Sequence, residues 1–129
     1  MIGSQPDGRS WPTKWMNRKY RLTSSTDFKR VRRTGKSYAH PLAILLVSPN
    51  GLTISRFGVT AGRALGNAVR RNRAKRRLRE ALGRYRPRIL SGQDVVLIAR
   101  PALNQAEWSD VLNALATLLG HAGLLEEEK

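Results

Sequence analysis

The chain has 129 residues, a length that suits one domain with a modest core and leaves no room for a second. It carries 24 Lys and Arg against 9 Asp and Glu, a formal net charge of +15, and no cysteine. Because like charges on a compact body repel each other, this imbalance predicts a polyanionic partner, and nucleic acid is favoured over a membrane surface or an acidic protein. The lack of cysteine excludes disulfides, thiolate metal sites and a Cys nucleophile, and is typical of a reducing cytoplasm.

Residues 1–17 mix Gly, Pro, Ser and isolated tryptophans without a period, and we interpret them as a flexible extension to a domain that spans 18–129. Trp11 and Trp15 have two open interpretations, stacking on bases or docking on the protein's own surface. The extension lacks the apolar core of a signal peptide, and no apolar run approaches the roughly 18 residues of a membrane span. The expectation is a soluble, cytoplasmic protein.

A short helix is predicted to open the domain. Ser24 followed by Asp27 resembles a capping box, a pattern with which helices begin. Phe28 and Val31 then share one helical face, and Gly35 suits the position just after a last helical turn.

Strands are predicted next. Residues 42–48 (LAILLVS) form an apolar run of strand length, and residues 52–60 (LTISRFGVT) alternate in part, as a half-buried strand does. The turn signal Pro-Asn-Gly at 49–51 separates them. These runs predict a hairpin, with a further short strand before it.

The second half predicts a helix, a strand and a helix. Residues 65–84 form a long basic helix, and residues 94–100 (DVVLIAR) are a nearly continuous apolar run of the kind that is buried on both faces. Asn104 is predicted to cap the last helix, with Glu107 three residues later. The apolar face of that helix consists of Trp108, Val111, Leu112, Leu115, Leu118 and Leu119. This order predicts an α+β sandwich with helices packed on one sheet.

The basic helix carries the functional prediction. Residues 63–88 hold 11 Lys and Arg but a single acid, Glu80, so the repulsion between like charges one turn apart is almost unrelieved. At about 100° per residue the helix has an apolar stripe and a polar side opposite to it. The stripe is Ala74, Leu78, Ala81, Leu82 and Tyr85; Asn72, Arg73, Arg76 and Arg79 lie opposite, and Arg71 and Lys75 flank the stripe. The dominance of arginine favours bidentate phosphate contacts and stacking.

Asn72 differs from its neighbours because it lowers helix propensity and brings no charge. One interpretation is a tolerated polar residue on the surface. The other is a directional hydrogen bond to a 2′-OH or base edge of RNA, placed among less selective cations.

The stretch FGVTAGRALGNAVRRNRAKRRLREAL, residues 57–82, resembles the signature of the bacterial ribonuclease P protein subunit family. The core of that signature is Gly-Asn-Ala-Val-x-Arg-Asn-Arg-x-Lys-Arg, with a further Arg after it. The chain matches it at Gly66, Asn67, Ala68, Val69, Arg71, Asn72, Arg73, Lys75, Arg76 and Arg79. The match is ungapped and includes charged, small and amide positions, so it is specific, and a weaker resemblance extends over about 18–120.

The resemblance implies a two-layer α/β sandwich of about four strands and three helices, with a left-handed β–α–β crossover at the basic helix. It also implies a role as the protein component of an endoribonuclease that matures tRNA 5′ ends. The expected catalyst is the RNA subunit, with magnesium held mainly by the RNA. The expected partners are this catalytic RNA and precursor tRNA, with no DNA and no membrane.

Residue by residue, the resemblance assigns contact with the catalytic RNA to Arg71, Asn72, Arg73, Lys75, Arg76 and Arg79. It assigns a cleft for the single-stranded 5′ leader of precursor tRNA to Phe28, Arg63 and Arg100, although Phe28 is equally well explained as a core residue. The chain departs from the family where many members have aromatic or basic residues, at Arg32, near Leu46 and at Ala64. The cleft is therefore expected to be less aromatic and more electrostatic.

Two other functions compete with this one. A nuclease that acts alone needs clustered carboxylates or histidines around metal ions, but the nine acids form no such motif, and His40 and His121 lie 81 residues apart. A ribosomal or architectural RNA-binding protein fits the charge and fold equally well. The signature discriminates against it, because a general phosphate binder gains nothing from Asn72 at a fixed place between arginines.

Overall fold

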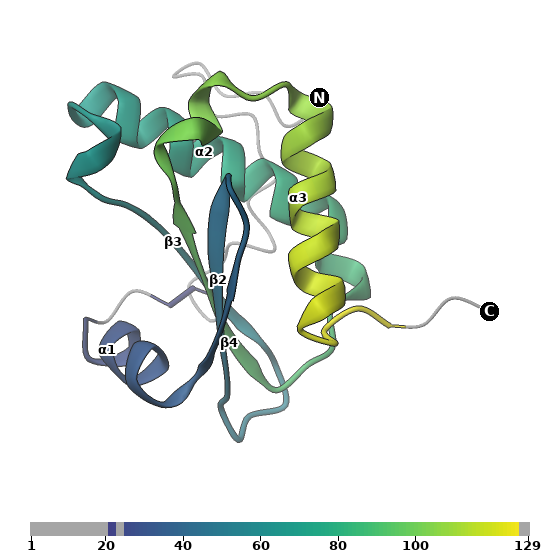
Figure 1. Ribbon diagram of the computed structural model, residues 1–129. Helices are drawn as coiled ribbons and strands as arrows, with labels where there is room; N and C mark the ends of the chain where they lie inside the picture. Colours follow the sequence, from purple (N-terminus) through teal and green to yellow (C-terminus); the bar gives the residue numbers. More distant parts are fainter. Residues whose placement is uncertain (1–20, 23–24, 127–129) are drawn as a thin grey trace, which may run out of the picture.

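The computed structural model describes residues 21–22 and 25–126, so the predicted extension at 1–17 and the predicted cap residue Ser24 lie outside the described residues. In the described part the elements follow in the order α1 (Ser25–Thr34), β1 (Lys36–Ala39), β2 (Ala43–Pro49), β3 (Arg56–Ala61), η3 (Arg63–Leu65), α2 (Ala68–Tyr85), η4 (Arg86–Arg88), β4 (Gln93–Ala99), η5 (Pro101–Gln105) and α3 (Trp108–His121) (Figure 1). The η elements are short 3-10 helices. The predicted α+β fold is confirmed.

The strands form one mixed sheet in the order β1-β2-β4-β3. β2 pairs antiparallel with both β1 and β4, whereas β3 runs parallel to β4. The short strand predicted ahead of residue 42 is thus present, but the predicted hairpin of residues 42–48 and 52–60 is wrong, because β4 lies between them. Val95, Val96 and Leu97 of β4 are almost completely buried, which confirms the expectation of a strand covered on both faces.

Asn50 explains why the turn at 49–51 does not close a hairpin. Its side chain donates to the carbonyl of Ile54 at 3.1 Å and to Asp94 of β4 at 2.9 Å, and its backbone N–H donates to the carbonyl of Gly92 at 3.0 Å. Gly51 does adopt the left-handed conformation that such a turn requires, with φ 72°. The chain therefore turns here, but its contacts lead to β4 instead of back to β2.

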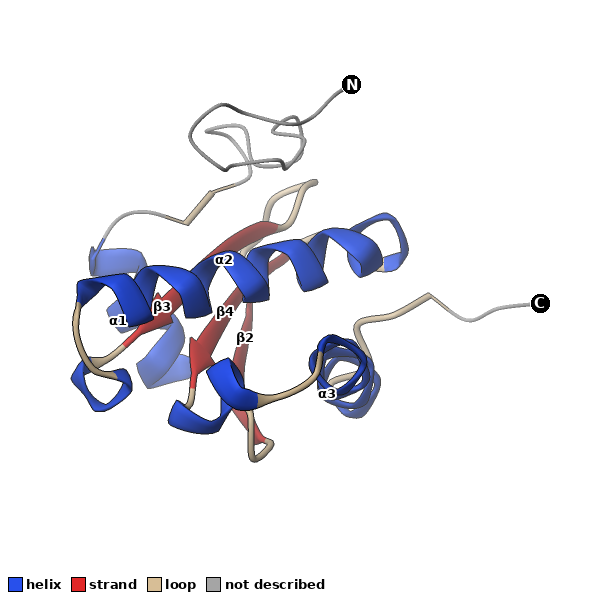
Figure 2. Ribbon diagram, turned by 90° about the horizontal axis from the view of Figure 1, so that it is seen from above, coloured by secondary structure: helices blue, strands red, loops and turns tan. Residues whose placement is uncertain are grey.

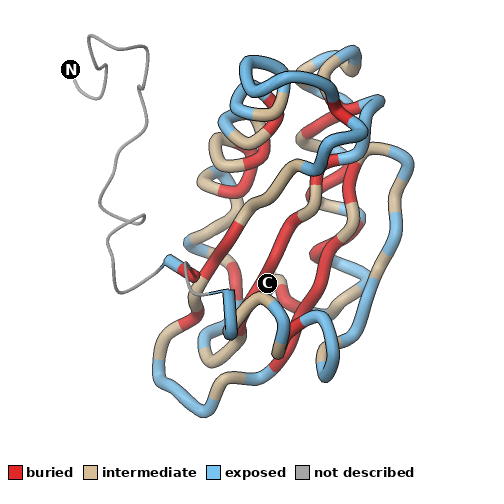
Figure 3. The backbone as a smooth tube through the Cα atoms, turned by 90° about the vertical axis from the view of Figure 1, so that its left-hand side faces the viewer, coloured by how far each residue is buried: buried red, intermediate tan, exposed pale blue. Residues whose placement is uncertain are grey.

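The helices cover the two faces of the sheet unequally. α2 and α3 pack on one face and enclose the larger core, whose centre includes Leu45, Leu78, Leu97 and Leu115. α1 covers part of the other face over a small cluster of Leu22, Val31, Leu46 and Val96. In Figure 2, α2 lies lengthwise over the strands and α3 is seen end-on, and Figure 3 shows buried residues along the central strands.

The β3–α2–β4 segment is a crossover between adjacent parallel strands, as the resemblance implies, and its left-handed sense stays a prediction. Because β3 and β4 run in the same direction, the connection must return along the whole sheet, and α2 provides that return. This topology fixes the basic helix lengthwise over the sheet. It places α2 on the face of the sheet opposite to α1.

The start of α3 corrects the predicted cap. Asn104 lies in η5, and α3 begins at Trp108 after the extended residue Glu107. Asn104 instead donates its side-chain N–H to the carbonyl of Arg70 at 3.0 Å. Most of the predicted apolar face is confirmed, since Val111, Leu115, Leu118 and Leu119 are buried, and Trp108 and Leu112 are half-buried; Ala114, which was not predicted, is buried with them.

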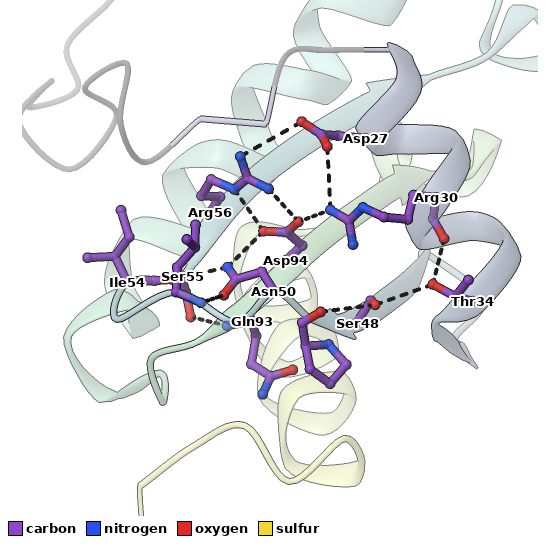
Figure 4. A network of polar contacts seen from close by, with 12 residues as sticks. Asp27, Arg30, Thr34, Ser48, Asn50, Ile54, Ser55, Arg56, Gln93 and Asp94 are labelled. Carbon is purple, nitrogen blue, oxygen red and sulfur yellow. Dashed lines mark hydrogen bonds and ion pairs between the residues drawn. The ribbon is translucent and has the colours of Figure 1, made fainter.

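A buried carboxylate links α1, β3 and β4. Asp94 is fully buried, and it accepts hydrogen bonds from Arg56 Nε at 3.0 Å, Arg56 Nη2 at 2.8 Å, Asn50 Nδ2 at 2.9 Å and Arg30 Nη2 (Figure 4). Asp27 of α1 lies 3.5 Å from Arg30 and 3.8 Å from Arg56. Burial by itself raises the pKa of the Asp94 carboxyl. The hydrogen bonds that it accepts from Arg56, Asn50 and Arg30 lower the pKa by more than burial raises it, so the pKa lies below its usual value.

We expect Asp94→Asn to lower the free energy of unfolding by about 3 kcal/mol at neutral pH, because the two guanidinium groups lose a buried counter-charge. Since the pKa of Asp94 is lower in the folded protein than in the unfolded chain, the contribution of its charge is fully present above the ordinary pKa of 3.8. It is lost as the pH falls through the lower folded value. Urea unfolding of both proteins over a pH series measures the difference.

Glu107→Gln is the matched control for this prediction, because it converts an exposed carboxylate that makes no cap hydrogen bond into an amide. Its effect should stay within about 0.5 kcal/mol. A difference between wild type and Asp94→Asn that does not shrink in acid would contradict the assignment.

Candidate nucleic-acid interface

The apolar stripe of α2 holds the basic helix on the sheet. Ala74, Leu78, Ala81 and Leu82 are buried, as predicted, and Tyr85 is half-buried. The Tyr85 hydroxyl donates to the carbonyl of Leu112 in α3 at 3.0 Å, which attaches the C-terminal end of α2 to α3. The opposite side of α2 therefore faces away from the core.

The start of α2 differs from the prediction. The helix begins at Ala68 and not at residue 65, because Gly66 has φ 111° and separates it from the 3-10 turn that contains the buried Leu65. Asn67 is the N-cap, and its side-chain oxygen accepts from the N–H of Arg70 at 3.0 Å. The Gly66-Asn67 pair of the signature thus has a structural task, since it sets where the basic helix starts and how it is oriented.

Five of the six residues predicted to contact the catalytic RNA lie where the helical spacing places them. Asn72, Arg73 and Arg76 are exposed on the outer side of α2. Arg71 and Lys75 are half-buried, which fits their predicted place beside the apolar stripe. The structure therefore presents an exposed amide beside two exposed guanidinium groups on one surface.

Arg79 departs from the predicted exposed side. Its side chain is half-buried, and the pKa of its guanidinium is lowered, first by burial and then by the nearby charge of Arg21. Arg21 forms an isolated parallel bridge with Phe57 of β3, so Arg79 lies on the flank of α2 that faces the β3 edge. A helical wheel places this position about 100° from Leu78 but cannot show that Arg21 lies near it.

Two other arginines of α2 bind groups of the protein itself. Arg77 donates Nη1 to the carbonyl of Leu103 at 2.6 Å and Nη2 to the carbonyl of Ala106 at 2.8 Å, and burial, followed by the charge of Arg73, lowers its pKa. Arg84 lies over the ring of Trp108, 5.9 Å from its centroid. The sequence offers no signal that separates these arginines from those on the exposed side, because their partners come from η5 and α3.

The three residues of the predicted leader cleft lie at two places on the sheet. Phe28 is half-buried on α1, and its ring lies so close to Gly58 that a Cβ there would be 2.7 Å from the ring. Arg63 and Arg100 are exposed and follow β3 and β4 at the same end of the sheet, where Ala61 pairs with Ala99. That end lies about 10 Å from Gly58, the length of three strand residues.

Between these two ends the α1 face is open. Ile44, Thr60 and Ile98 lie side by side on three strands and are only half-buried; we call them the open strip. Arg100 continues the extended backbone of β4, so it shares the side of Ile98. An apolar floor with an aromatic ring at one end and guanidinium groups at the other suits a short single-stranded nucleic acid.

The metal-binding side chains of the described residues, 21–22 and 25–126, do not gather into one site. In that part of the chain, no three His, Cys, Asp or Glu side chains lie close enough to hold a metal ion. Asp94, which is buried, is surrounded by arginine and asparagine donors. No helix of the described segments is long and apolar enough to cross a bilayer. The arrangement fits binding and positioning of a polyanion.

Comparisons with known proteins agree with this geometry. The family model described as Ribonuclease P matches residues 16–123. The ribonuclease P protein components of Herpetosiphon aurantiacus and Symbiobacterium thermophilum are 39% and 40% identical over 114 residues, which cover 88% of this chain and 93% and 99% of theirs. The RNase P protein structures of Staphylococcus aureus and Thermotoga maritima give TM-scores of 0.75 and 0.71 at 30% and 32% identity, and cover 83% and 78% of this chain and 98% and 96% of theirs. The chain therefore belongs to the ribonuclease P protein family.

Proposed function

We propose that this protein is the protein subunit of a ribonuclease P particle, in which it binds the catalytic RNA and the 5′ leader of precursor tRNA and so supports endonucleolytic 5′ maturation. The observation that carries this proposal is the exposed side of α2, where Asn72, Arg73 and Arg76 are exposed together within the stretch that the family model matches. A cytoplasmic location remains part of the proposal.

The two predicted contact surfaces lie on opposite faces of the sheet. α2 covers the face of the larger core, and the open strip with Phe28 lies on the face of α1. A protein with two such surfaces can hold the catalytic RNA on one side and the substrate's leader on the other. This arrangement supports a role in substrate positioning, which lowers the entropic cost of bringing the cleavage site to the catalyst.

Catalysis is proposed to reside in the RNA subunit, with magnesium held mainly by RNA. The described residues hold no group of three or more His, Cys, Asp or Glu side chains that could bind a metal ion, and magnesium is commonly held by phosphate oxygens together with only one or two carboxylates. The chain's own contribution is binding and orientation.

Reconstitution tests the proposal directly. At low magnesium, the protein mixed with its candidate catalytic RNA should cleave precursor tRNA accurately at the 5′ end of the mature sequence, faster than the RNA alone. The protein without the RNA should not cleave. Cleavage by the protein alone would assign the activity to a nuclease and overturn the proposal.

Asn72→Ala and Arg76→Ala should separate two kinds of contact on α2. Both residues are exposed, so neither change should unfold the protein. Asn72→Ala is expected to weaken binding to the catalytic RNA without changing the slope of log affinity against log salt. Arg76→Ala should lower that slope by about one unit, as for one lost phosphate contact. Identical behaviour of the two variants would contradict this division.

Leader binding should be strongly salt-sensitive, because the cleft is expected to depend on Arg63 and Arg100 more than on stacking. The measurement is the affinity of the reconstituted particle for precursor and for mature tRNA across a salt series. The advantage of the precursor should fall as salt rises. An advantage that stays constant would show that apolar or stacking contacts dominate the cleft.

A further inference from the structure

α1 has the weakest apolar anchor of the three helices. Val31 is its only buried residue among those described, whereas four residues of α2 and five of α3 are buried. At about 1.5–3 kcal/mol per fully buried aliphatic side chain, Val31 and the half-buried ring of Phe28 are a small apolar anchor for a ten-residue helix. The position of α1 must therefore depend on other contacts.

Polar contacts supply much of this attachment. Arg30 reaches from the middle of α1 to the buried Asp94 of β4, and Asp27 lies 3.8 Å from Arg56 of β3 (Figure 4). At the end of α1, the Thr34 hydroxyl lies 3.5 Å from the hydroxyl of Ser48 in β2. Because Asp94 is fully buried, its hydrogen bonds with guanidinium groups are stronger and more directional than exposed ion pairs.

Two glycines let α1 approach closely. A Cβ at Gly35 would lie 2.5 Å from the carbonyl oxygen of Val47 in β2, and a Cβ at Gly58 would lie 2.7 Å from the ring of Phe28. The backbone of α1 and the ring of Phe28 therefore rest directly on the sheet. These contacts set the distance between α1 and the sheet. The hydrogen bond from Arg30 to Asp94 sets the place on the sheet at which α1 lies.

The four charges of this network balance each other. Asp27 and Asp94 face Arg30 and Arg56, two carboxylates against two guanidinium groups. The exposed side of α2 has no such balance, since the only acid of that helix is Glu80. A neutral network attracts phosphate weakly, so its two arginines are poorly suited to be ligands of RNA although they lie beside the predicted cleft.

We propose that the network of Asp27, Arg30, Arg56 and Asp94 is a positioning device that fixes α1, and with it Phe28, beside the open strip, so that it determines the contribution of the 5′ leader to substrate binding without contacting RNA. This inference rests on the proposed function, because it assumes that the leader lies along the α1 face. Arg30 and Arg56 are positioning residues in this view, and the direct contacts belong to Phe28, Arg63 and Arg100.

Arg30→Gln tests the proposal, because it removes the link from α1 to Asp94 while Arg56, on the neighbouring strand, keeps its two hydrogen bonds to the same carboxylate. Arg33→Gln is the matched control: the same change on the same helix, at an exposed position outside the network. Gly58→Ala is a second, uncharged perturbation, because the added methyl group must displace the ring of Phe28.

The reconstituted particle is assayed for three quantities: affinity of the protein for the catalytic RNA, the ratio of precursor to mature tRNA affinity, and the salt slope of that ratio. Arg30→Gln and Gly58→Ala should each lower the ratio on the order of 2- to 30-fold, with the slope and the affinity for catalytic RNA unchanged. Arg33→Gln should change the ratio by less than about twofold. Any effect of its lost charge should appear in the salt slope alone.

An Arg30→Gln protein with an unchanged ratio would overturn the proposal. So would a slope reduced by about one unit, since this would make Arg30 a phosphate ligand. A parallel loss of affinity for the catalytic RNA would also overturn it, by showing a general defect in folding. If the wild-type particle binds precursor and mature tRNA equally well, the particle does not bind the leader. In that case the proposed function is wrong, and the role of the network is wrong with it.

Discussion

The packing of one apolar stripe of α2 against the sheet is the constraint on which the rest of the molecule depends. Each pair of like charges one turn apart costs a helix about 0.2–0.5 kcal/mol, and α2 carries several. Burial of Leu78 and Leu82 contributes about 1.5–3 kcal/mol each, so the core side outweighs the repulsion on the outer side. The helix therefore stays folded while Arg73 and Arg76 are exposed on its outer side, which makes them available to a polyanion.

The protein treats its positive charge differently on its two faces. On the α1 face, Arg30 and Arg56 are neutralised by buried or half-buried carboxylates and serve to attach a helix that has little apolar surface. On the α2 face, Arg73 and Arg76 are exposed on a helix whose only acid is Glu80. The same residue type thus acts as an internal connector or as a binding group according to whether a carboxylate lies within reach.

The sequence predicted the second half of the fold better than the first. The stripe of α2 and the apolar face of α3 follow a helical period that their own residues define, and both are confirmed. The hairpin prediction failed because the signal at Asn50-Gly51 is local, whereas β2 and β3 both pair with β4, whose residues come 44 to 56 positions after their β2 partners and 38 after their β3 partners. The helix start at residue 65 was misplaced because Leu65 belongs to a separate 3-10 turn, which Gly66 ends with φ 111° before α2 begins.

By itself the sequence determined the charge, the amphipathic helix and the residues that match the family's signature, because these properties depend on composition and on spacing within one element. Only the tertiary structure decided which arginines remain free for a partner: Arg77 is bound to carbonyls of η5 and its vicinity, and Arg30 and Arg56 meet at Asp94. The physical reason is that a guanidinium group reaches across elements to acceptors that are remote in the chain. Its role is therefore set by what the fold brings within hydrogen-bonding distance.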